Sequence, residues 1–404
     1  MIPLIAWRNI WRHKIRSLVV ILSIAVGLWA GVFMIAFSWG MYKQYMRETV
    51  NTQLSHLQLH HPGFEEDHEV QYLLTNNISM MDYIRADDKI KAATARTVST
   101  GMISSPTTAT GVTINGIFPE EENKVTQLAS RIVEGKYLDN EGRNPVLIGK
   151  KLATKLKVNL KNKIILTFQD TSGEIVAGAF RIAGIYQSKN TTLDEMNVYV
   201  RSADLSQLLK IENAVHEIAI LLKDDSNLDV VKDKLKNKFP AVTVRTWKEL
   251  APELELVINS FNEYMYIFVG IILLALTFGI INTMLMAVLE RIREIGMLMA
   301  IGMSRTRIFF MIMLETIYLA LVGGPLGLLI GYFFISWTGK VGIDMSMYAE
   351  GLSAWGFSSI VYPELESGYY LPLTLMTVFT AVLSAIYPAI RALRLKPAEA
   401  IRKI

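Results

Sequence analysis

Cysteine is absent from the 404 residues of this sequence, and its absence removes several kinds of site. A chain without thiols has no disulfide, no thiolate-bound metal and no cysteine nucleophile. Charged residues are few, at 19%, and the net charge is only +4. The basic residues form no continuous stripe, so the sequence gives no indication of nucleic-acid binding.

Motifs for catalysis are also missing. Gly339-Lys340 lacks the upstream glycine and the following Ser or Thr of a phosphate-binding loop, and GxSxG, HExxH and CxxC do not occur. Histidines and acidic residues gather around Pro62-Gly63, but this segment is predicted to be a solvated loop rather than a metal site. They are His56, His60, His61, His68, Glu65, Glu66 and Asp67. We therefore predict a chain that is not an enzyme, has no catalytic residue and binds no metal.

Apolar residues, in contrast, are abundant, at 51%, and four long runs concentrate them. A helix needs about 20 mostly apolar residues to cross a bilayer, and no other part of the sequence approaches that length. The predicted spans are 18–39, 266–289, 308–337 and 371–390. The first is too long for the apolar core of a cleaved signal peptide, and no small-residue cleavage site follows it. We interpret it as a signal anchor that stays in the chain.

Lysine and arginine near the span ends predict the orientation, because these residues concentrate in cytoplasmic loops. They cluster before the first span, between the second and third, and after the fourth. Both termini and the loop 290–307 are therefore predicted to be cytoplasmic, and residues 40–265 and 338–370 to lie outside. The basic residues are Arg8, Arg12, Lys14, Arg16, Arg291, Arg293, Arg305, Arg307, Arg391, Arg394, Lys396, Arg402 and Lys403.

Two features inside the spans concern packing. Glycines recur every four residues, a spacing that lets helix backbones approach closely in lipid. They are Gly27 and Gly31 in the first span and Gly323, Gly327 and Gly331 in the third. Contact within the chain is the expected role, and a subunit interface is the alternative. Glu315 is expected to be paired or to lie near the headgroups, because an isolated charge in lipid is costly; a substrate or proton path is the alternative.

Residues 40–265 are long enough for two modules and show both strand and helix periodicity. Two β-α-β units are predicted, one at each end of this segment: 52–60, 78–91 and 95–104, then 215–223, 228–239 and 242–247. The middle is predicted to be an insertion with strands 112–117, 163–168 and 176–186 and helices 146–156 and 203–209. Asp170-Thr171-Ser172-Gly173 is the predicted hairpin turn. The segments beside the first two spans are predicted to extend the membrane helices outward.

The cytoplasmic loop carries the most specific pattern. Glu290-Arg291-Ile292-Arg293-Glu294-Ile295-Gly296 is followed by Met297-Leu298-Met299-Ala300-Ile301-Gly302, which predicts a short charged helix closed by Gly302. Such a helix suits docking onto a cytoplasmic partner, and an ordinary membrane-surface helix is the alternative. The pattern E-R-x-R-E-I-G-x-x-x-A-x-G, directly after a span with Gly279, Asn282 and Thr283, resembles the FtsX-like, MacB-type permease family of ABC transporters.

Both ends of the chain support the same resemblance. The stretch Ala6-Trp7-Arg8-Asn9-Ile10-Trp11-Arg12, with Lys14-Ile15-Arg16-Ser17, is similar to the first helix of that family. Tyr387-Pro388-Ala389, Arg391-Ala392 and Pro397-Ala398-Glu399-Ala400-Ile401-Arg402 are similar to its closing motif. The resemblance covers the whole chain and implies a membrane α-helical fold with four transmembrane helices plus an α/β periplasmic domain of porter and sabre type.

The resemblance, combined with the spans, implies a division of the chain into domains. These are a cytoplasmic N-terminus (1–17), a first span (18–39), a periplasmic domain (40–265), a second span (266–289), a coupling helix (290–307), a third span (308–337), a periplasmic loop (338–370), a fourth span (371–390) and a cytoplasmic tail (391–404). Within the periplasmic domain, the porter part would cover about 50–106 and 213–250, and the sabre-like insertion about 107–212.

For function, the resemblance implies a permease subunit that works by mechanotransmission rather than through an aqueous channel. It would lie in the bacterial inner membrane beside a second permease, the same or a related chain. A cytoplasmic ABC ATPase dimer would bind ATP and Mg, so this chain would need no cofactor. The residues implied to contact the ATPase are Glu290, Arg291, Arg293, Glu294, Ile295, Gly296, Ala300 and Gly302. Substrate would arrive sideways between the first two spans, at Val32, Phe33, Ala36, Tyr264, Phe268 and Ile271.

Among the types in this family, the sequence is most similar to the lipoprotein-releasing (LolC/LolE-type) permeases, since the external domain is large and no ATPase is fused to it. That similarity implies extraction of lipoproteins from the inner membrane for transfer toward the outer membrane. The hairpin at 169–177 is shorter than the hook that recruits a periplasmic lipoprotein carrier in that type. The chain would then be the hookless partner or a homodimer. The alternatives are MacB-like efflux of small molecules or peptides with an adaptor protein, and regulation of a cell-wall hydrolase.

Overall fold

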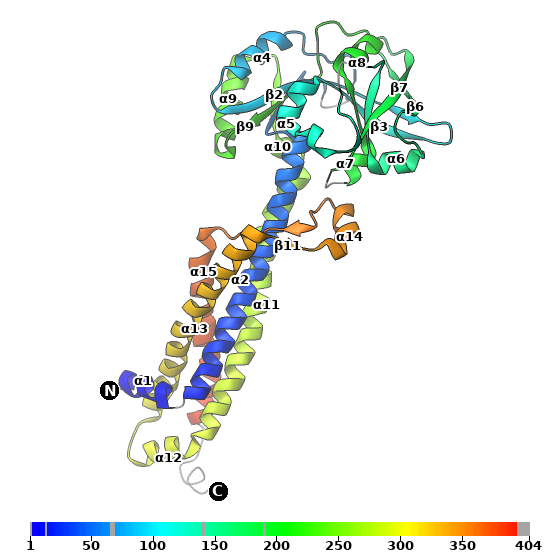
Figure 1. Ribbon diagram of the computed structural model, residues 1–404. Coiled ribbons are helices and arrows are strands. Elements are labelled where there is room, and N and C mark those ends of the chain that lie inside the picture. Colours follow the sequence, from blue (N-terminus) through cyan, green and yellow to red (C-terminus); the bar gives the residue numbers. More distant parts are fainter. Residues whose placement is uncertain (1, 13, 65–68, 139–141, 189–190, 394–404) are drawn as a thin grey trace. The chain divides into compact units, whose positions relative to one another are not determined.

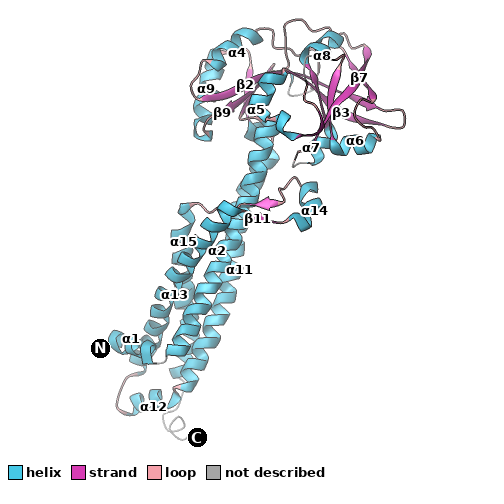
Figure 2. Cartoon of the chain, viewed as in Figure 1, coloured by secondary structure: helices cyan, strands magenta, loops and turns pink. Residues whose placement is uncertain are grey.

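The computed structural model describes residues 2–12, 14–64, 69–138, 142–188 and 191–393 (Figure 1). The chain divides into two compact units. The helical unit comprises Met1–Met41, Ile258–Asp344 and Ile360–Ile404, and the α/β unit comprises Tyr42–Val257 and Met345–Ser359. Figure 2 shows that most strands belong to the α/β unit.

The helical unit confirms the four predicted membrane helices. Among the described residues, four helices are long and apolar enough to cross a bilayer: Ser17–Leu54, Glu263–Glu290, Arg305–Val341 and Ser367–Leu393. They lie in α2 (Lys14–Thr49, followed by the π-helical turn Val50–Leu54), α11 (Pro252–Glu290), α13 (Arg305–Val341) and α15 (Tyr370–Leu393). α2 and α11 extend beyond their apolar spans, as predicted. The unit also contains α1 (Ile2–Arg12), α12 (Ile292–Ala300) and the short strands β11 (Ile343–Asp344) and β12 (Ile360–Val361).

The membrane glycines are contact points between helices of the same chain. A Cβ atom on Gly327 of α13 would lie 2.6 Å from the carbonyl oxygen of Ala25 in α2. A Cβ atom on Gly31 of α2 would lie 3.0 Å from Ile272 in α11. Real Cβ atoms essentially never come closer than 3.0 Å to another atom, so neither position has room for a larger side chain. At these glycines α2 therefore lies very close to α11 and α13. The expected role of these glycines, contact within the chain, is confirmed.

One half of the α/β unit contains both predicted β-α-β units. Their elements are β1 (Leu57–His60), α4 (Asn77–Arg85) and β2 (Ile90–Ser104), then β9 (Glu217–Leu222), α9 (Leu228–Lys238) and β10 (Thr243–Thr246). The strand order is β10-β1-β9-β2, and each neighbouring pair is antiparallel. The two β-α-β units, which are far apart in sequence, therefore interleave in one sheet. Each helix connects two parallel strands that are separated by a strand of the other β-α-β unit.

The other half is a ring of strands that shares β2. The remaining strands are β3 (Ala109–Ile117), β4 (Ile132–Gly135), β5 (Pro145–Gly149), β6 (Lys163–Gln169), β7 (Ile175–Tyr186) and β8 (Asn197–Arg201). Since β6 pairs with both β2 and β7, the order β2-β3-β8-β5-β7-β6 closes on itself. Its interior is apolar, with Ile114, Ile148 and Phe180 almost fully buried.

Short helices lie next to these strands, and one further short helix lies in the loop between the third and fourth spans. They are α5 (Pro119–Thr126), α6 (Lys150–Leu156), α7 (Thr191–Met196), α8 (Ser202–Leu209), α10 (Trp247–Leu250) and α14 (Ala349–Ala354). α8 supplies Leu205 and Leu209 to the apolar interior of the ring. Figure 1 shows α6 and α8 next to the strands β3, β6 and β7.

Three predicted elements differ from the structure. The helix predicted at 78–91 ends at Arg85, and Ile90 already begins strand β2. The helix predicted at 146–156 begins only at Lys150, because Val146–Ile148 form strand β5, buried and paired with β7 on one edge and β8 on the other. The strand predicted from residue 52 begins at Leu57, because Val50–Leu54 form the π-helical turn after α2. The predicted turn at 170–173 is confirmed: the Gly173 amide donates to the carbonyl of Asp170 (3.0 Å), and Gly173 has a φ of +80°.

The prediction that the histidines lie in a solvated loop is wrong for two of them. His56 and His60 are buried, with 7% and 3% of their surface exposed. The Leu222 amide donates to Nδ1 of His56 (3.0 Å), and His60 lies 2.9 Å from the Gln58 side chain. The neighbouring residues Glu65, Glu66, Asp67 and His68 lie outside the described residues. Across the described part of the chain, no group of three potential metal ligands comes together.

Candidate functional site

The candidate site is the short helix α12, whose ends are fixed by local chemistry. Arg291 precedes its first turn, and the chain leaves the helix through Gly302, at a φ of +98°. The Met303 amide donates to the Leu298 carbonyl (3.0 Å), and the Gly302 amide donates to the Met299 carbonyl (3.1 Å). These two bonds satisfy carbonyls that a helix end otherwise leaves unpaired, and the positive φ favours glycine. The predicted closure at Gly302 is confirmed.

One face of α12 is fixed to the membrane helices by apolar contacts. Ile295 has only 3% of its surface exposed, and Gly296 is also buried. Ile295 joins an apolar cluster that includes Val288 of α11 and Ile308 and Ile312 of α13. Burying an isoleucine side chain contributes about 1.5–3 kcal/mol, so this one residue holds the helix firmly against both neighbours.

An ion-pair network reinforces that attachment. The Arg291 guanidinium donates through Nε to Glu294 (2.9 Å) and through Nη1 to both carboxylate oxygens of Glu315 (3.2 and 3.3 Å). The side chains of Arg291 and Glu315 are only 10% and 12% exposed. Arg12 lies 4.0 Å from the other oxygen of Glu294. Glu315 is therefore paired, as expected for a charge inside a predicted span, and the pair joins the start of α12 to α13.

The opposite face of α12 is exposed. Arg293, Met297, Ala300 and Ile301 follow one another at helical spacing, and all four are exposed. Met297 is 51% exposed and Ile301 86% exposed. We call these four residues the outer stripe. Glu290 at the end of α11 and Gly302 are exposed as well, so the loop presents both charge and apolar surface.

The structure does not bring onto one surface the six residues at which substrate was predicted to arrive between the first two spans. Val32 and Ala36 are buried, and Phe33 is half-buried with its ring 5.2 Å from that of Phe334. The three residues of α11 are exposed by 54–60%: Tyr264, Phe268 and Ile271. Only the α11 residues therefore remain candidates for contact with a substrate or lipid outside this chain.

The motifs at the two ends of the chain pack close to the candidate site. In α1, Ile10 is buried in the same apolar cluster as Ile295, and its carbonyl accepts a hydrogen bond from Ser17 (2.7 Å). The Trp7 ring meets Tyr318 of α13 edge-on at 5.7 Å. Ala389 and Ala392 of α15 belong to that cluster too. The predicted closing residues Pro397–Arg402 lie outside the described residues.

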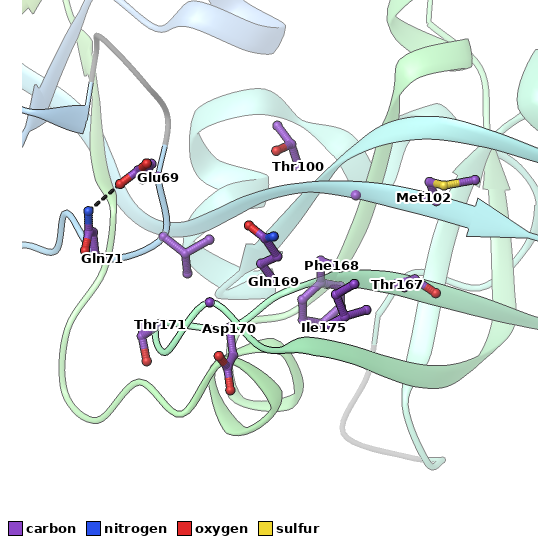
Figure 3. Close-up of a pocket in the computed structure, with 13 residues that line it drawn as sticks. Glu69, Gln71, Thr100, Met102, Thr167, Phe168, Gln169, Asp170, Thr171 and Ile175 are labelled. Carbon is purple, nitrogen blue, oxygen red and sulfur yellow. Dashed lines mark hydrogen bonds between the residues drawn. The ribbon is translucent and has the colours of Figure 1, made fainter.

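A second concave region lies in the α/β unit beside the turn between β6 and β7 (Figure 3). It encloses about 460 Å³, and its walls include Thr100, Met102 and Gln169. The Asp170 carboxylate accepts from the amides of Ser172 (2.8 Å) and Glu174 (3.0 Å), which fixes the turn. This hairpin is short, as the sequence indicates, and the cavity beside it was not predicted.

The chain matches two known families. Residues 17–238, more than half of the chain, match the MacB-like periplasmic core domain, and residues 266–397 match the FtsX-like permease C-terminal family. The chain belongs to the FtsX-like permeases with a MacB-like periplasmic core domain. It is therefore an ABC transporter permease of the MacB and LolC type, and the predicted fold class, four membrane helices plus an α/β periplasmic domain, is confirmed.

Two relatives of the permease carry different descriptions. The lipoprotein-releasing system transmembrane protein LolC of Neisseria meningitidis is 22% identical over 306 residues, which cover 72% of this chain and 73% of LolC. The macrolide export ATP-binding/permease protein MacB of Campylobacter jejuni is 24% identical over 427 aligned positions, which cover 99% of this chain and 61% of MacB. The crystal structure of the periplasmic region of MacB from Actinobacillus actinomycetemcomitans matches 52% of this chain and 98% of that region, with 14% identity and a TM-score of 0.38.

Proposed function

We propose that this permease is the non-catalytic membrane subunit of an ATP-driven transporter and that α12 docks onto a cytoplasmic ATPase dimer. The observation that supports this proposal is the contrast between the two faces of α12. Ile295 and Arg291 fix one face to α11 and α13, whereas Met297 and Ile301 expose apolar surface on the other. Adjacent exposed apolar side chains with a charged rim are typical of protein contacts.

In this proposal the ion-pair network passes force from the ATPase to the membrane helices. Arg291 lies between α11 and α12 and bonds to Glu315 one-third of the way along α13. A displacement of α12 would therefore move α11 and α13 rather than bend the loop. ATP and Mg would be held by the ATPase, and a second permease, the same or a related chain, would complete the assembly.

Docking is tested on the outer stripe. Met297→Asp places a charge at the centre of the proposed contact, so it should weaken copurification with the ATPase by at least about tenfold, as expected for a central interface residue. Met297→Leu keeps the apolar surface and serves as the matched control. Each variant is purified in detergent with the ATPase co-expressed, and the ratio of the two chains is measured. Equal ratios for Asp and Leu would overturn the assignment of α12.

For the substrate, we propose lipoproteins that are extracted from the outer leaflet of the bacterial inner membrane and passed toward the outer membrane. The LolC match and the large α/β domain support this assignment. The exposed α11 residues Tyr264, Phe268 and Ile271 would then meet acyl chains arriving sideways from the bilayer. A periplasmic lipoprotein carrier would accept the product.

Depletion of the permease in its native host tests the substrate. Inner and outer membranes are separated, and lipoproteins are quantified in each. Accumulation in the inner membrane supports lipoprotein extraction, whereas unchanged sorting sinks it. The second candidate, export of small molecules or peptides with an adaptor protein, is favoured by the MacB match over 99% of the chain. It predicts increased sensitivity to macrolides or peptides in the same depleted cells.

A further inference from the structure

Helix α1 is held against the membrane helices along one of its sides. Ala6 and Ile10 are buried, and Ile10 belongs to an apolar cluster with residues of α11, α13 and α15. The Ser17 hydroxyl donates to the Ile10 carbonyl (2.7 Å), which fixes the corner between α1 and α2. Figure 1 shows that α1 runs across the direction of the membrane helices, at the same end of the helical unit as α12. The position of α1 is therefore set by buried contacts within that unit.

Another side of α1 exposes a stripe of apolar residues. Leu4, Trp7 and Trp11 follow one another at helical spacing, and each is at least 45% exposed. We call these three residues the α1 stripe. The Trp7 ring meets Tyr318 edge-on at 5.7 Å, and Tyr318 belongs to a helix that is long and apolar enough to cross the bilayer. Trp and Tyr are the residues that gather where a bilayer meets water, so the α1 stripe has the composition of a membrane-interface segment.

Exposed apolar residues continue directly after α1. Ile15, Leu18 and Leu22, at the start of α2, are all exposed, and Leu18 and Leu22 lie in the first candidate span. Outward-facing apolar residues of a membrane span contact lipid, because the hydrocarbon core surrounds the span. The α1 stripe adjoins these residues in the same compact unit. Lipid can therefore cover both groups of residues, whereas a soluble partner could cover only the first.

Two arginines lie beside the α1 stripe. Arg8 follows Leu4 by four residues and Arg12 follows Arg8 by four, so both are on the neighbouring face of the helix. Both are exposed, and the Arg12 side chain is 70% exposed. Arg12 lies 4.0 Å from Glu294, which is too far for a hydrogen bond. The sequence of α1, Ile2–Arg12, contains no Asp or Glu.

The residues at this end of the chain that lie outside the described ranges do not reverse the charge. They are His13 and 394–404, and the latter segment contains four basic residues and one glutamate. The basic residues are Arg394, Lys396, Arg402 and Lys403, and the glutamate is Glu399. The surface around α1 therefore favours a negatively charged partner. A helix with one apolar face and one basic face is typical of a segment that lies in the headgroup region of a membrane.

We propose that α1 binds an anionic phospholipid of the cytoplasmic leaflet. The α1 stripe would lie among the first carbons of the acyl chains. The Arg8 and Arg12 guanidinium groups would donate hydrogen bonds to the phosphate of the headgroup. The inference goes beyond ATPase docking and substrate transport and depends on neither, since it concerns the membrane lipid itself.

Native mass spectrometry tests the proposal on the full-length permease in detergent. The permease is titrated with dioleoylphosphatidylglycerol or with zwitterionic dioleoylphosphatidylcholine, and the bound lipid is measured. Phosphatidylglycerol should bind at least about tenfold more tightly than phosphatidylcholine, because each basic residue near the headgroup adds attraction for negative charge. Soluble glycerol phosphate, which has the same phosphate but no acyl chain, should not displace the lipid, and displacement would overturn the role of the α1 stripe.

Two double variants that remove the same charge separate a local site from general positive charge. Arg8→Gln/Arg12→Gln should weaken phosphatidylglycerol binding at least about tenfold and change phosphatidylcholine binding less than about twofold. Arg305→Gln/Arg307→Gln removes two exposed arginines from the start of α13 and should change both affinities less than about twofold. Equal losses in the two double variants would overturn the assignment to α1. So would equal binding of the two lipids by the unaltered permease.

A second measurement locates the α1 stripe. Because the sequence has no cysteine, Leu4→Cys provides a single site for a spin label. The label's collision rates with oxygen, which concentrates in lipid, and with a water-soluble nickel complex are compared in nanodiscs of mixed phosphatidylcholine and phosphatidylglycerol. Leu22→Cys in the first span is the lipid reference, and Lys236→Cys on the exposed face of α9 is the water reference. We expect the label at position 4 to resemble the lipid reference, and resemblance to the water reference would overturn the proposal.

Discussion

Replacing Arg96 should strongly destabilise the α/β unit. Arg96 lies in β2, the strand shared by the two halves of the unit. Its guanidinium bonds to both oxygens of Glu122 in α5 (2.8 and 2.9 Å) and to Glu217 in β9 (2.7 Å). The three side chains are 7%, 0% and 10% exposed, so all three charges are shielded from water.

The size of the effect follows from what Arg96→Met leaves behind. Two carboxylates would remain buried near each other without a cation, and removing one partner from a buried ion pair costs about 3–5 kcal/mol. For a unit of this size, the free energy of unfolding falls by about 2–3 kcal/mol per M urea. The urea midpoint should therefore fall by about 1–2.5 M.

Pulse proteolysis of the full-length permease in detergent, across a urea series, measures that midpoint. The triple variant Arg96→Met/Glu122→Gln/Glu217→Gln removes the charges together and should regain at least about half of the loss, because neutral amides cost less to bury than carboxylates. An unchanged midpoint for Arg96→Met would refute the reasoning. A triple variant as unstable as Arg96→Met would show that packing, not charge, is responsible.

Two further predictions test the same structure at other points. Burial lowers the pKa of His216 to about 4, because its ring is enclosed and His60 lies near it, although the hydrogen bond between Nε2 and the Val70 carbonyl opposes the shift. Nδ1 accepts from the Val98 amide. The unfolded state then binds more protons between about pH 6.5 and 4, so unfolding should become easier by about 2 kcal/mol from pH 7 to pH 5. Pulse proteolysis at both pH values should show this loss, and His216→Phe should reduce it; an equal loss in the variant would contradict the assignment. In the membrane helices, Gly327→Ala should lower the stability of the helical unit by about 1–3 kcal/mol, because the new Cβ would lie 2.6 Å from the Ala25 carbonyl oxygen. Gly324→Ala, whose Cβ meets nothing within 4 Å, is the matched control in a thermal unfolding assay in detergent, and similar melting temperatures would reject the packing argument.

The sequence predicted elements whose signals are local. Apolar periodicity located α9 and β9, and the span lengths located the four membrane helices. Gly302 marked the end of α12, because only a residue tolerant of positive φ suits that position. These features depend on neighbours a few residues away, which a sequence displays directly.

The features that the sequence did not predict depend on residues far away in the chain. Val146–Ile148 has the apolar run of either a buried strand or a helix, and only the pairing with β7 and β8 decides for the strand. Closure of the ring requires β6 to pair with β2, some 60 residues away. His60 lies in β1, an inner strand with β10 and β9 on its two sides, and His56, directly before β1, also bonds to both flanking segments through Ile220 and Trp247. In the candidate site, the motif indicated Arg291 and Glu294, but nothing in it indicated that Glu315 completes the network.

The two faces of α12 also bear on the proposed transfer of force from an ATPase. A nine-residue helix is too short to be stable alone in water, so its position must come from what it packs against. Ile295 and the Arg291–Glu315 pair provide that support on α11 and α13, while the outer stripe stays available. α11 then runs for 39 residues with its one proline, Pro252, at the first position, where proline does not interrupt a helix. A helix of that length extends about 58 Å. If an ATPase docks on α12 as proposed, a push on Met297 would reach an unbroken helix through buried contacts, so mechanical coupling would follow from the packing as well as from the motif.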